Sequence, residues 1–144
     1  MRFIAIILLV LLACCDIAQA QVVYFPESEP VSTVFTVSKQ MQRPVLMKFY
    51  TDWCVQCKRM DEEVFGDVAT STYINENFIA VKVDGELLKD YEFVEKYAIK
   101  AFPTTLILDE TGKVLSRLIG YYGQIPLNEE LRSVIRTRQA TARN

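Results

Sequence analysis

Apolar residues along the chain fall into runs and periodic patterns that predict strands and helices in alternation. Nearly continuous apolar runs at 45–50, 78–83 and 104–108 are typical of core strands, and a short β-like run lies at 22–25. Helical spacing predicts helices over 31–43, 54–65, 67–77 and 87–97, and Pro126 opens a last helix. The segment 109–112 predicts a hairpin turn with Gly112 at positive φ, before a returning strand at 114–119.

Two of the predicted helices have a defined inner face. In the helix that begins at Cys54, the spacing places Cys57, Met60 and Val64 on one face and points Asp61 outward. In the helix over 87–97, Leu88, Tyr91, Val94 and Glu95 fall in near-helical register, and the apolar members Leu88, Tyr91 and Val94 are predicted to face the core. Carboxylates in the same region are predicted to form a solvated helix face rather than a metal site: Asp84, Glu86, Asp90, Glu92 and Glu95.

The order of elements, β-α-β-α-α-β-α-β-β-α, predicts an α/β fold. Alternating βα units favour parallel strands, and the closing hairpin adds an antiparallel pair, so the central sheet should be mixed and flanked by helices. The first strand and helix form an N-terminal β-α extension to this core. Neither an internal repeat nor a linker divides the chain, which predicts one domain over 21–144.

The first twenty residues have the pattern of an export signal. Arg2 gives a positive start, 3–12 is uncharged and apolar, and Ala18 and Ala20 are the small residues before a cleavage site. Cleavage would leave residues 21–144, in the periplasm or outside the cell. A rival interpretation is a lipoprotein signal at 11–14, in which Cys14 would carry lipid and anchor the domain to a membrane.

The amino-acid composition excludes several classes of partner and of catalytic site. The chain has 144 residues, 51% hydrophobic and 24% charged, with a net charge of −2, so it has a core but no basic surplus for nucleic acid. It has no histidine, which excludes imidazole catalysis and His-ligated metals. Of four cysteines, only Cys54 and Cys57 lie outside the signal, too few for a four-ligand zinc site. These two can form a disulfide with each other.

The pair Cys54 and Cys57 lies at a predicted strand-to-helix junction. There the first sulfur meets unpaired backbone N–H groups and the positive end of the helix dipole, so the pKa of Cys54 should fall below the free value of roughly 8.5. The thiolate is the attacking species in disulfide exchange, and Cys57 is close enough to resolve the mixed disulfide. A purely structural disulfide is the alternative, although so short a loop constrains the unfolded chain little.

The segment from Phe49 to Lys58, with Trp53 before the first cysteine, and the later Phe102-Pro103-Thr104 resemble the thioredoxin family. The similarity is strongest to periplasmic thioredoxin-like proteins, including the C-terminal domain of the transmembrane thiol:disulfide interchange reductase. The resemblance implies a thioredoxin fold, a cis Pro103 beside the disulfide, and no cofactor other than the redox-active Cys54–Cys57 pair. It also implies a client-contacting surface and supporting residues: Phe102, Thr104, Gly120, Tyr121 and Trp53.

Lys48 departs from the family pattern. Many members carry a buried acid six residues before the first cysteine, where this chain has lysine in a core strand. One hypothesis places Lys48 near Cys57, where it helps to deprotonate the thiol or stabilises the thiolate. The alternative is that its stem packs while its amine reaches a nearby carboxylate. Trp53 likewise has two interpretations, core support or contact with a partner.

These observations predict an exported thiol-disulfide oxidoreductase that exchanges disulfides with client proteins, more as a reductant than as an oxidant. The family resemblance implies that a membrane partner supplies the electrons. The dipeptide Val55-Gln56 does not set the reduction potential. The alternative function is a thioredoxin-fold module that binds clients with little turnover.

Overall fold

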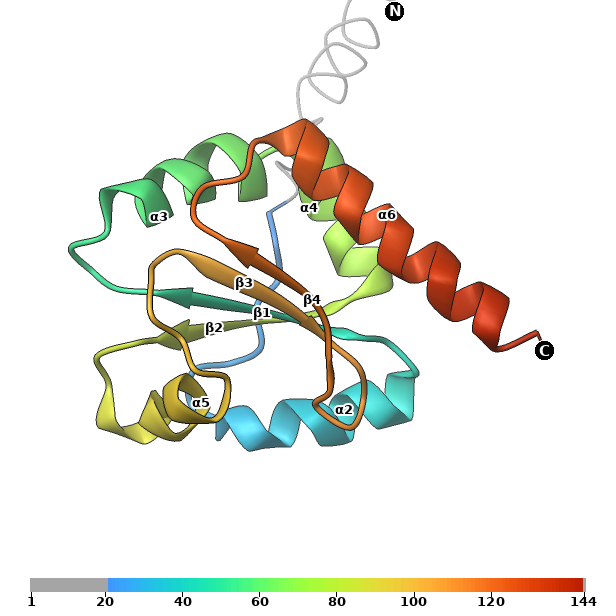
Figure 1. Ribbon diagram of the computed structural model, residues 1–144, viewed down its shortest axis with the longest axis horizontal. Helices are drawn as coiled ribbons and strands as arrows, with labels where there is room; N and C mark the ends of the chain where they lie inside the picture. Colours follow the sequence, from blue (N-terminus) through green and yellow to red (C-terminus); the bar gives the residue numbers. More distant parts are fainter. Residues whose placement is uncertain (1–20, 144) are drawn as a thin grey trace, which may run out of the picture.

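In a computed structural model, residues 21–143 are described and form a four-stranded sheet with helices on both faces (Figure 1). The strands lie in the order β2-β1-β3-β4. Strand β1 runs parallel to β2 and antiparallel to β3, and β4 is antiparallel to β3, so the sheet is mixed as predicted. The strand bounds are β1 Val45–Tyr50, β2 Ile79–Asp84, β3 Thr104–Leu108 and β4 Val114–Ile119.

Helices α3, α4 and α6 cover one face of the sheet, and α2 and α5 cover the other (Figure 1). Each face has its own apolar core, and β1 contributes to both by alternation: Leu46 packs with the first core, and Val45 and Met47 with the second. Strand β1 is therefore buried on both faces, as its apolar run predicted. The helix bounds are α2 Val34–Met41, α3 Val55–Met60, α4 Val68–Asn77, α5 Tyr91–Lys96 and α6 Gln124–Thr141.

Local signals set most helix ends. Gln42 follows α2 in the left-handed conformation, and the Asp67 carboxylate caps α4 by accepting from the Thr70 amide at 2.9 Å. The last helix begins at Gln124, two residues before the Pro126 that was predicted to open it. A proline fits this third position because the first amides of a helix have no intrahelical acceptor.

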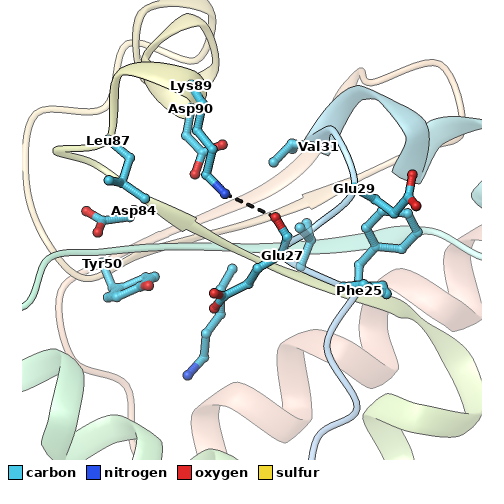
Figure 2. Close-up of a pocket in the computed structure, with 12 residues that line it drawn as sticks. Phe25, Glu27, Glu29, Val31, Tyr50, Asp84, Leu87, Lys89 and Asp90 are labelled. Atoms are coloured by element: carbon cyan, nitrogen blue, oxygen red, sulfur yellow. Dashed lines mark hydrogen bonds between the residues drawn. The ribbon is translucent and has the colours of Figure 1, made fainter.

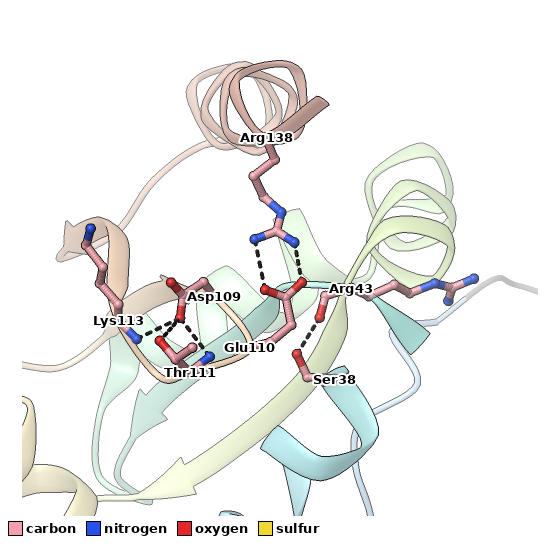
Figure 3. A network of polar contacts seen from close by, with 7 residues as sticks. All are labelled: Ser38, Arg43, Asp109, Glu110, Thr111, Lys113 and Arg138. Atoms are coloured by element: carbon pink, nitrogen blue, oxygen red, sulfur yellow. Dashed lines mark hydrogen bonds and ion pairs between the residues drawn. The ribbon is translucent and has the colours of Figure 1, made fainter. Parts of the chain in front are cut away.

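The hairpin between β3 and β4 is held by side chains as well as by its turn. Gly112 has the predicted positive φ, 87°, and the Asp109 carboxylate accepts hydrogen bonds from the Thr111 and Lys113 amides (Figure 3). Glu110, in the same turn, pairs with Arg138 of α6, which connects the hairpin to the C-terminal helix (Figure 3).

Two predicted elements differ from the structure. The run at 22–25 makes only an isolated bridge between Tyr24 and Ala80, because Pro26 follows and cannot donate to a ladder. The helix predicted over 87–97 begins as a 3-10 turn, Leu88–Asp90, before α5. A 3-10 turn advances three residues per turn rather than 3.6, so the register shifts.

The shifted register changes which residues of this segment are buried. Phe93 and Tyr97 are buried and Asp90 is only 5% exposed, whereas Leu88 is 91% and Tyr91 48% exposed. The predicted inner face with Leu88 and Tyr91 is therefore wrong. The prediction of a solvated face is also wrong for Asp90, whose pKa is raised by burial.

The predicted signal, with Arg2 and Cys14, lies outside the described residues. Within 21–143, none of the helices has the length and apolar character needed to span a bilayer.

Candidate functional site

Cys54 and Cys57 form a disulfide where β1 gives way to α3. Cys54 is the N-cap residue of α3, in an extended conformation, and its amide donates to the Thr51 carbonyl at 3.2 Å across the preceding turn. The two Cα atoms are 5.2 Å apart. Both cysteines are largely covered, with exposed fractions of 4% for Cys54 and 2% for Cys57. The disulfide thus lies beyond the carboxyl end of the central strand β1, at the start of a helix.

The cap places a hydrogen-bond donor at the first sulfur. The Cys57 amide donates to Cys54 Sγ at 3.1 Å, and the Lys58 amide donates to the Cys54 carbonyl at 3.2 Å. Amides at a helix start have no intrahelical acceptor, so they are free to stabilise negative charge on a capping atom. This geometry suits a sulfur that becomes a thiolate when the disulfide is opened.

The segment before β3 lies against the residue that precedes Cys54. The Phe102–Pro103 peptide bond is cis, and the Pro103 carbonyl accepts from the Gly120 amide at 2.8 Å. The Phe102 ring contacts the Trp53 ring edge to face, with centroids 6.2 Å apart. Thr104, in contrast, is buried and donates its hydroxyl to the Ala101 carbonyl, so its side chain does not reach the surface.

Trp53 is held on the surface and is not part of the core. It is 65% exposed, and its indole N–H donates to Glu86 Oε1 at 2.9 Å. Glu86 comes from the loop after β2, the strand that pairs with β1. Of the two interpretations of Trp53, the structure excludes core support. Its exposed ring is free to contact a partner.

Gly85 leaves room for the Phe102 ring. A Cβ atom on Gly85 would lie well inside van der Waals contact with two atoms of that ring. Because Phe102 in turn supports Trp53, the glycine sets the position of both aromatic rings beside the disulfide.

We therefore expect Gly85→Ala to displace Phe102 and change the surroundings of Trp53. The stability cost should be about 1 kcal/mol, the low end for overpacking, because the atoms that must move belong to a half-buried ring. Trp53 is the only tryptophan, so its fluorescence emission reports the change directly, with urea denaturation as the stability measurement. Gly123→Ala is the matched control, since its nearest atom would be 4.0 Å away. Unchanged emission in Gly85→Ala would contradict this account.

Lys48 is fully buried on the α3 side of the sheet, and its ammonium pairs with the Asp61 carboxylate. Asp61 also accepts from Lys82 at 3.4 Å, and Lys48 and Lys82 are register partners across β1 and β2. Burial lowers the pKa of Lys48, and the hydrogen bond and charge of Asp61 oppose that shift. The contact matches the alternative in which the lysine amine reaches a carboxylate. A role toward Cys57 stays a prediction.

Asp61 does not point outward as predicted. The α-helix widens into a π-turn over Asp61–Phe65, which rotates the positions after Met60 relative to the 3.6-residue period. Asp61 itself lies one turn after the buried Cys57, on the same face of the helix, and its side chain, 32% exposed, pairs with Lys48. The other prediction for this helix is confirmed, because Cys57, Met60 and Val64 are all buried.

Gly120 and Tyr121, predicted to complete an apolar rim, have a more polar setting. The Tyr121 hydroxyl donates to Glu63 Oε2 at 2.6 Å, and the Arg59 guanidinium lies 4.8 Å from the centre of its ring. Glu63 also accepts a hydrogen bond from Arg59 Nε at 3.0 Å. The hydrogen bonds from Tyr121 and Arg59 lower the pKa of Glu63. Gly120 adopts a positive φ of 90°. Tyr121 therefore belongs to a hydrogen-bonded surface network, and the apolar side of the site is the side with Trp53 and Phe102.

Sequence reasoning missed three residues that build this site: Asp61, Gly85 and Glu86. Asp61 lies one helical turn after Cys57, and that spacing could have indicated an inward position. Gly85 and Glu86 follow a core strand but contact residues at positions 102 and 53, which no local pattern shows. Among the described residues, no group of three or more cysteine and carboxylate side chains is arranged to hold a metal.

A mixed sheet with a Cys-x-x-Cys disulfide at the start of its first core helix defines a thioredoxin-fold dithiol protein. The chain belongs to the thioredoxin-like domain family, whose family model matches residues 31–135. This membership confirms the predicted family and fold.

Individual relatives agree with the family. The thiol:disulfide interchange protein DsbD of Vibrio vulnificus (strain CMCP6) is 27% identical over 110 residues, 74% of this chain and 18% of that protein. The matched region thus spans about a fifth of the length of the curated relatives it matches first. A disulphide-isomerase candidate from Bacteroides thetaiotaomicron superposes with a TM-score of 0.69 at 28% identity, covering 82% of this chain and 97% of that one. The oxidised DsbD C-terminal domain of Neisseria meningitidis gives a TM-score of 0.63 at 19% identity, covering 76% and 97%.

Proposed function

We propose that this chain is a protein thiol-disulfide oxidoreductase that acts through Cys54 and Cys57. The observation that carries the proposal is the position of Cys54, which caps α3 and accepts the Cys57 amide at its sulfur. The relatives support it, since they are named thiol:disulfide interchange proteins and protein disulfide-isomerases. Trp53 and Phe102 supply the exposed aromatic surface beside the disulfide, and the Phe102 backbone is the candidate for pairing with an extended client segment.

In the reducing direction the reaction has two exchange steps. The Cys54 thiolate attacks a client cystine, forming a mixed disulfide while the client S–S bond breaks and one client sulfur leaves as a thiolate. Cys57, as a thiolate, then attacks Cys54 Sγ, forms the intramolecular disulfide and expels the second client thiolate. The client gains two electrons from the dithiol and two protons through solvent. A dithiol donor must afterwards return two electrons to the Cys54–Cys57 disulfide.

We infer that the chain works as a reductant in the exported compartment, with a membrane dithiol protein as its donor. Similarity to DsbD supports this direction. The test is equilibrium titration of the Cys54–Cys57 couple against glutathione. The expected potential lies nearer the thioredoxin value of about −270 mV than the oxidant value of about −120 mV. A value near the oxidising end would overturn the direction and leave the exchange chemistry intact.

Export itself can be tested on the mature protein. We propose cleavage after Ala20, so that mass spectrometry of the exported chain should identify Gln21 as its first residue. A chain that instead begins at Cys14, with added lipid mass, would show that the domain is tethered to a membrane.

A further inference from the structure

An apolar surface extends from the disulfide turn along the loop after β2. We call it the Trp53–Tyr91 surface: Trp53, Leu87, Leu88, Tyr91 and Phe102. The indole of Trp53 is tied to Glu86, and Leu87 and Leu88 follow Glu86 directly in the chain. Leu87, Leu88 and Tyr91 are all exposed, with Leu88 the most exposed large apolar residue of the described chain. Single exposed leucines are ordinary, but several exposed apolar residues on a loop that is hydrogen-bonded to the residue before Cys54 indicate a binding surface.

This surface is bordered by carboxylates. Between positions 84 and 95 the chain has five acidic residues and one basic residue, Lys89. The ammonium of Lys89 donates to the Glu27 carbonyl at 3.1 Å (Figure 2). Asp84 and Tyr50 lie together at the ends of β2 and β1, beside Leu87 (Figure 2).

The same acidic character continues to the turn before Cys54. Asp52 is exposed there, and Glu86 is exposed opposite it, next to Trp53. Burial raises the pKa of Tyr50, and so do the charges of Asp84, Glu27 and Asp52, which is consistent with carboxylates gathered around this end of the sheet. Exposed cations on the same and flanking segments are Lys58, Arg59, Lys89, Lys96 and Lys100. Within the turn 50–53 and the loop 84–88, which meet at the Trp53–Glu86 contact, the charged side chains are all carboxylates: Asp52, Asp84 and Glu86.

We propose that the Trp53–Tyr91 surface docks client segments in which an apolar residue adjoins lysine or arginine beside the client cystine. This inference rests on the proposed function and names its preferred substrate class. The apolar side chain of the client would cover Trp53 and Leu88, and its cation would meet the carboxylates of Asp84 and Glu86. Because these carboxylates are solvent-accessible, their main effect is to speed encounter with cationic clients, and salt screens that effect.

The test uses two disulfide-bridged peptides that are identical except for two flanking residues, lysine in one and glutamate in the other. The reduced protein should reduce the lysine peptide with a kcat/KM about 10-fold higher at low ionic strength, the low end of electrostatic steering. In ~0.5 M NaCl, where the Debye length is only a few ångströms, the preference should fall below about 2-fold. Fluorescence of Trp53 follows the reaction.

Charge-neutral variants locate the effect. In Asp84→Asn/Glu86→Gln/Glu92→Gln, the ratio between the two peptides should approach one, because shape is kept and three charges are lost. The matched control removes three carboxylates from α4 and α6 by Glu76→Gln/Glu129→Gln/Glu130→Gln, and it should keep the wild-type ratio. Comparing ratios within each variant separates selectivity from any change in overall rate.

The apolar residues of the Trp53–Tyr91 surface are tested by a separate variant with its own control. Leu88→Ser should lower kcat/KM for both peptides by about 5-fold, equivalent to the ~1 kcal/mol lost with part of an apolar contact, without changing their ratio. Met41→Ser, at the exposed end of α2, should change neither rate.

Equal rates for the two peptides at low salt, or a preference that survives in the Asp84/Glu86/Glu92 variant, would overturn the inference while the oxidoreductase assignment stands. If the reduced protein leaves both peptides and glutathione disulfide unreacted, the proposed function fails and the substrate preference fails with it.

Discussion

Replacing Cys54 by serine is expected to reduce the rate of insulin reduction by about 10³-fold or more, the scale on which loss of a covalent nucleophile acts. Serine keeps the N-cap geometry, because its oxygen can accept the same Cys57 amide that Cys54 Sγ accepts at 3.1 Å. A neutral hydroxyl, however, is not a thiolate and cannot attack a client disulfide. The measurement is insulin turbidity with dithiothreitol as donor.

The matched variant is Cys57→Ser, which keeps the attacking sulfur and removes the resolving one. It should accumulate a mixed disulfide between Cys54 and the client, visible as a band on a non-reducing gel that disappears with reductant. In contrast, Cys54→Ser should form no such band. Both variants should be compared with the reduced wild type, because a disulfide that closes so short a loop contributes only ~2 kcal/mol in the chain-entropy account.

This pair of variants also separates an enzyme from a client-binding module. If Cys54→Ser loses insulin reduction and the wild type has it, the chain turns over clients. Client binding retained by both proteins, with no reduction by either, would contradict the proposed chemistry and favour the module. Folding of each variant is checked by circular dichroism, so that loss of activity is not confused with loss of structure.

Local sequence signals were sufficient for most of the fold. Strands β1, β3 and β4 have the predicted bounds because their ends are marked by Pro44, Pro103 and Gly112, and each of these residues restricts the backbone on its own. Departures from the prediction occur where tertiary packing decides the backbone. The 3-10 turn before α5 alters the helical period, and a fixed 3.6-residue template then assigns Leu88 to the wrong side. The outward position predicted for Asp61 was wrong for another reason, because Asp61 lies one turn after Cys57 and the template itself places the two on one face.

The candidate site likewise combines features that local sequence indicates with contacts that depend on tertiary packing. Cys54 and Cys57 lie three positions apart, are the only cysteines outside the predicted signal and follow a predicted strand, so local sequence indicated a disulfide at a helix start. Contacts between Trp53 and Glu86, and between Lys48 and Asp61, join separate elements. Such pairs depend on how β1, β2 and α3 pack, and a single sequence contains no direct signal for that packing. For Lys48, burial in a core strand allowed two interpretations, a role toward Cys57 or a carboxylate partner, and the sequence did not decide between them.

Removing the carboxylate of Asp61 should strongly destabilise the fold. Asp61→Asn is expected to lower the free energy of unfolding by about 3 kcal/mol at neutral pH, because it leaves the ammonium of fully buried Lys48 without its counter-charge. Lys48→Met should stay within about 1 kcal/mol of the wild type, since an apolar side chain of similar length replaces a buried charge. Asp61 would then still pair with Lys82 at 3.4 Å.

Lys82→Met is the matched control. The Lys82 side chain is only partly buried, so its loss should cost no more than about 1 kcal/mol, as for an exposed pair. Urea denaturation of the oxidised proteins gives all four free energies. A loss in Asp61→Asn no larger than that in Lys82→Met would show that the Lys48 ammonium is not dependent on Asp61.

The contribution of Lys48 to the free energy of unfolding should change with pH in a defined direction. Burial lowers the pKa of Lys48 in the folded protein below its ordinary value of 10.5, so between the two values the unfolded chain binds more protons. Stability from this residue therefore rises with pH toward 10.5. In Asp61→Asn the pKa should fall further, because both effects of Asp61 on Lys48 raise it. The stability gap between Asp61→Asn and the wild type should consequently narrow as pH rises from 7 to 10.

Lys48→Met also decides whether Lys48 acts on the chemistry. Without an amine at this position, any pH-dependent help to Cys57 is lost, and the alkylation profile of Cys57 in the reduced protein should shift to higher pH if Lys48 stabilises its thiolate. All other titratable groups are common to wild type and variant, so the difference between the two profiles isolates the lysine. An unchanged profile and exchange rate would leave Lys48 as a structural partner of Asp61, and the proton-handling hypothesis would be wrong.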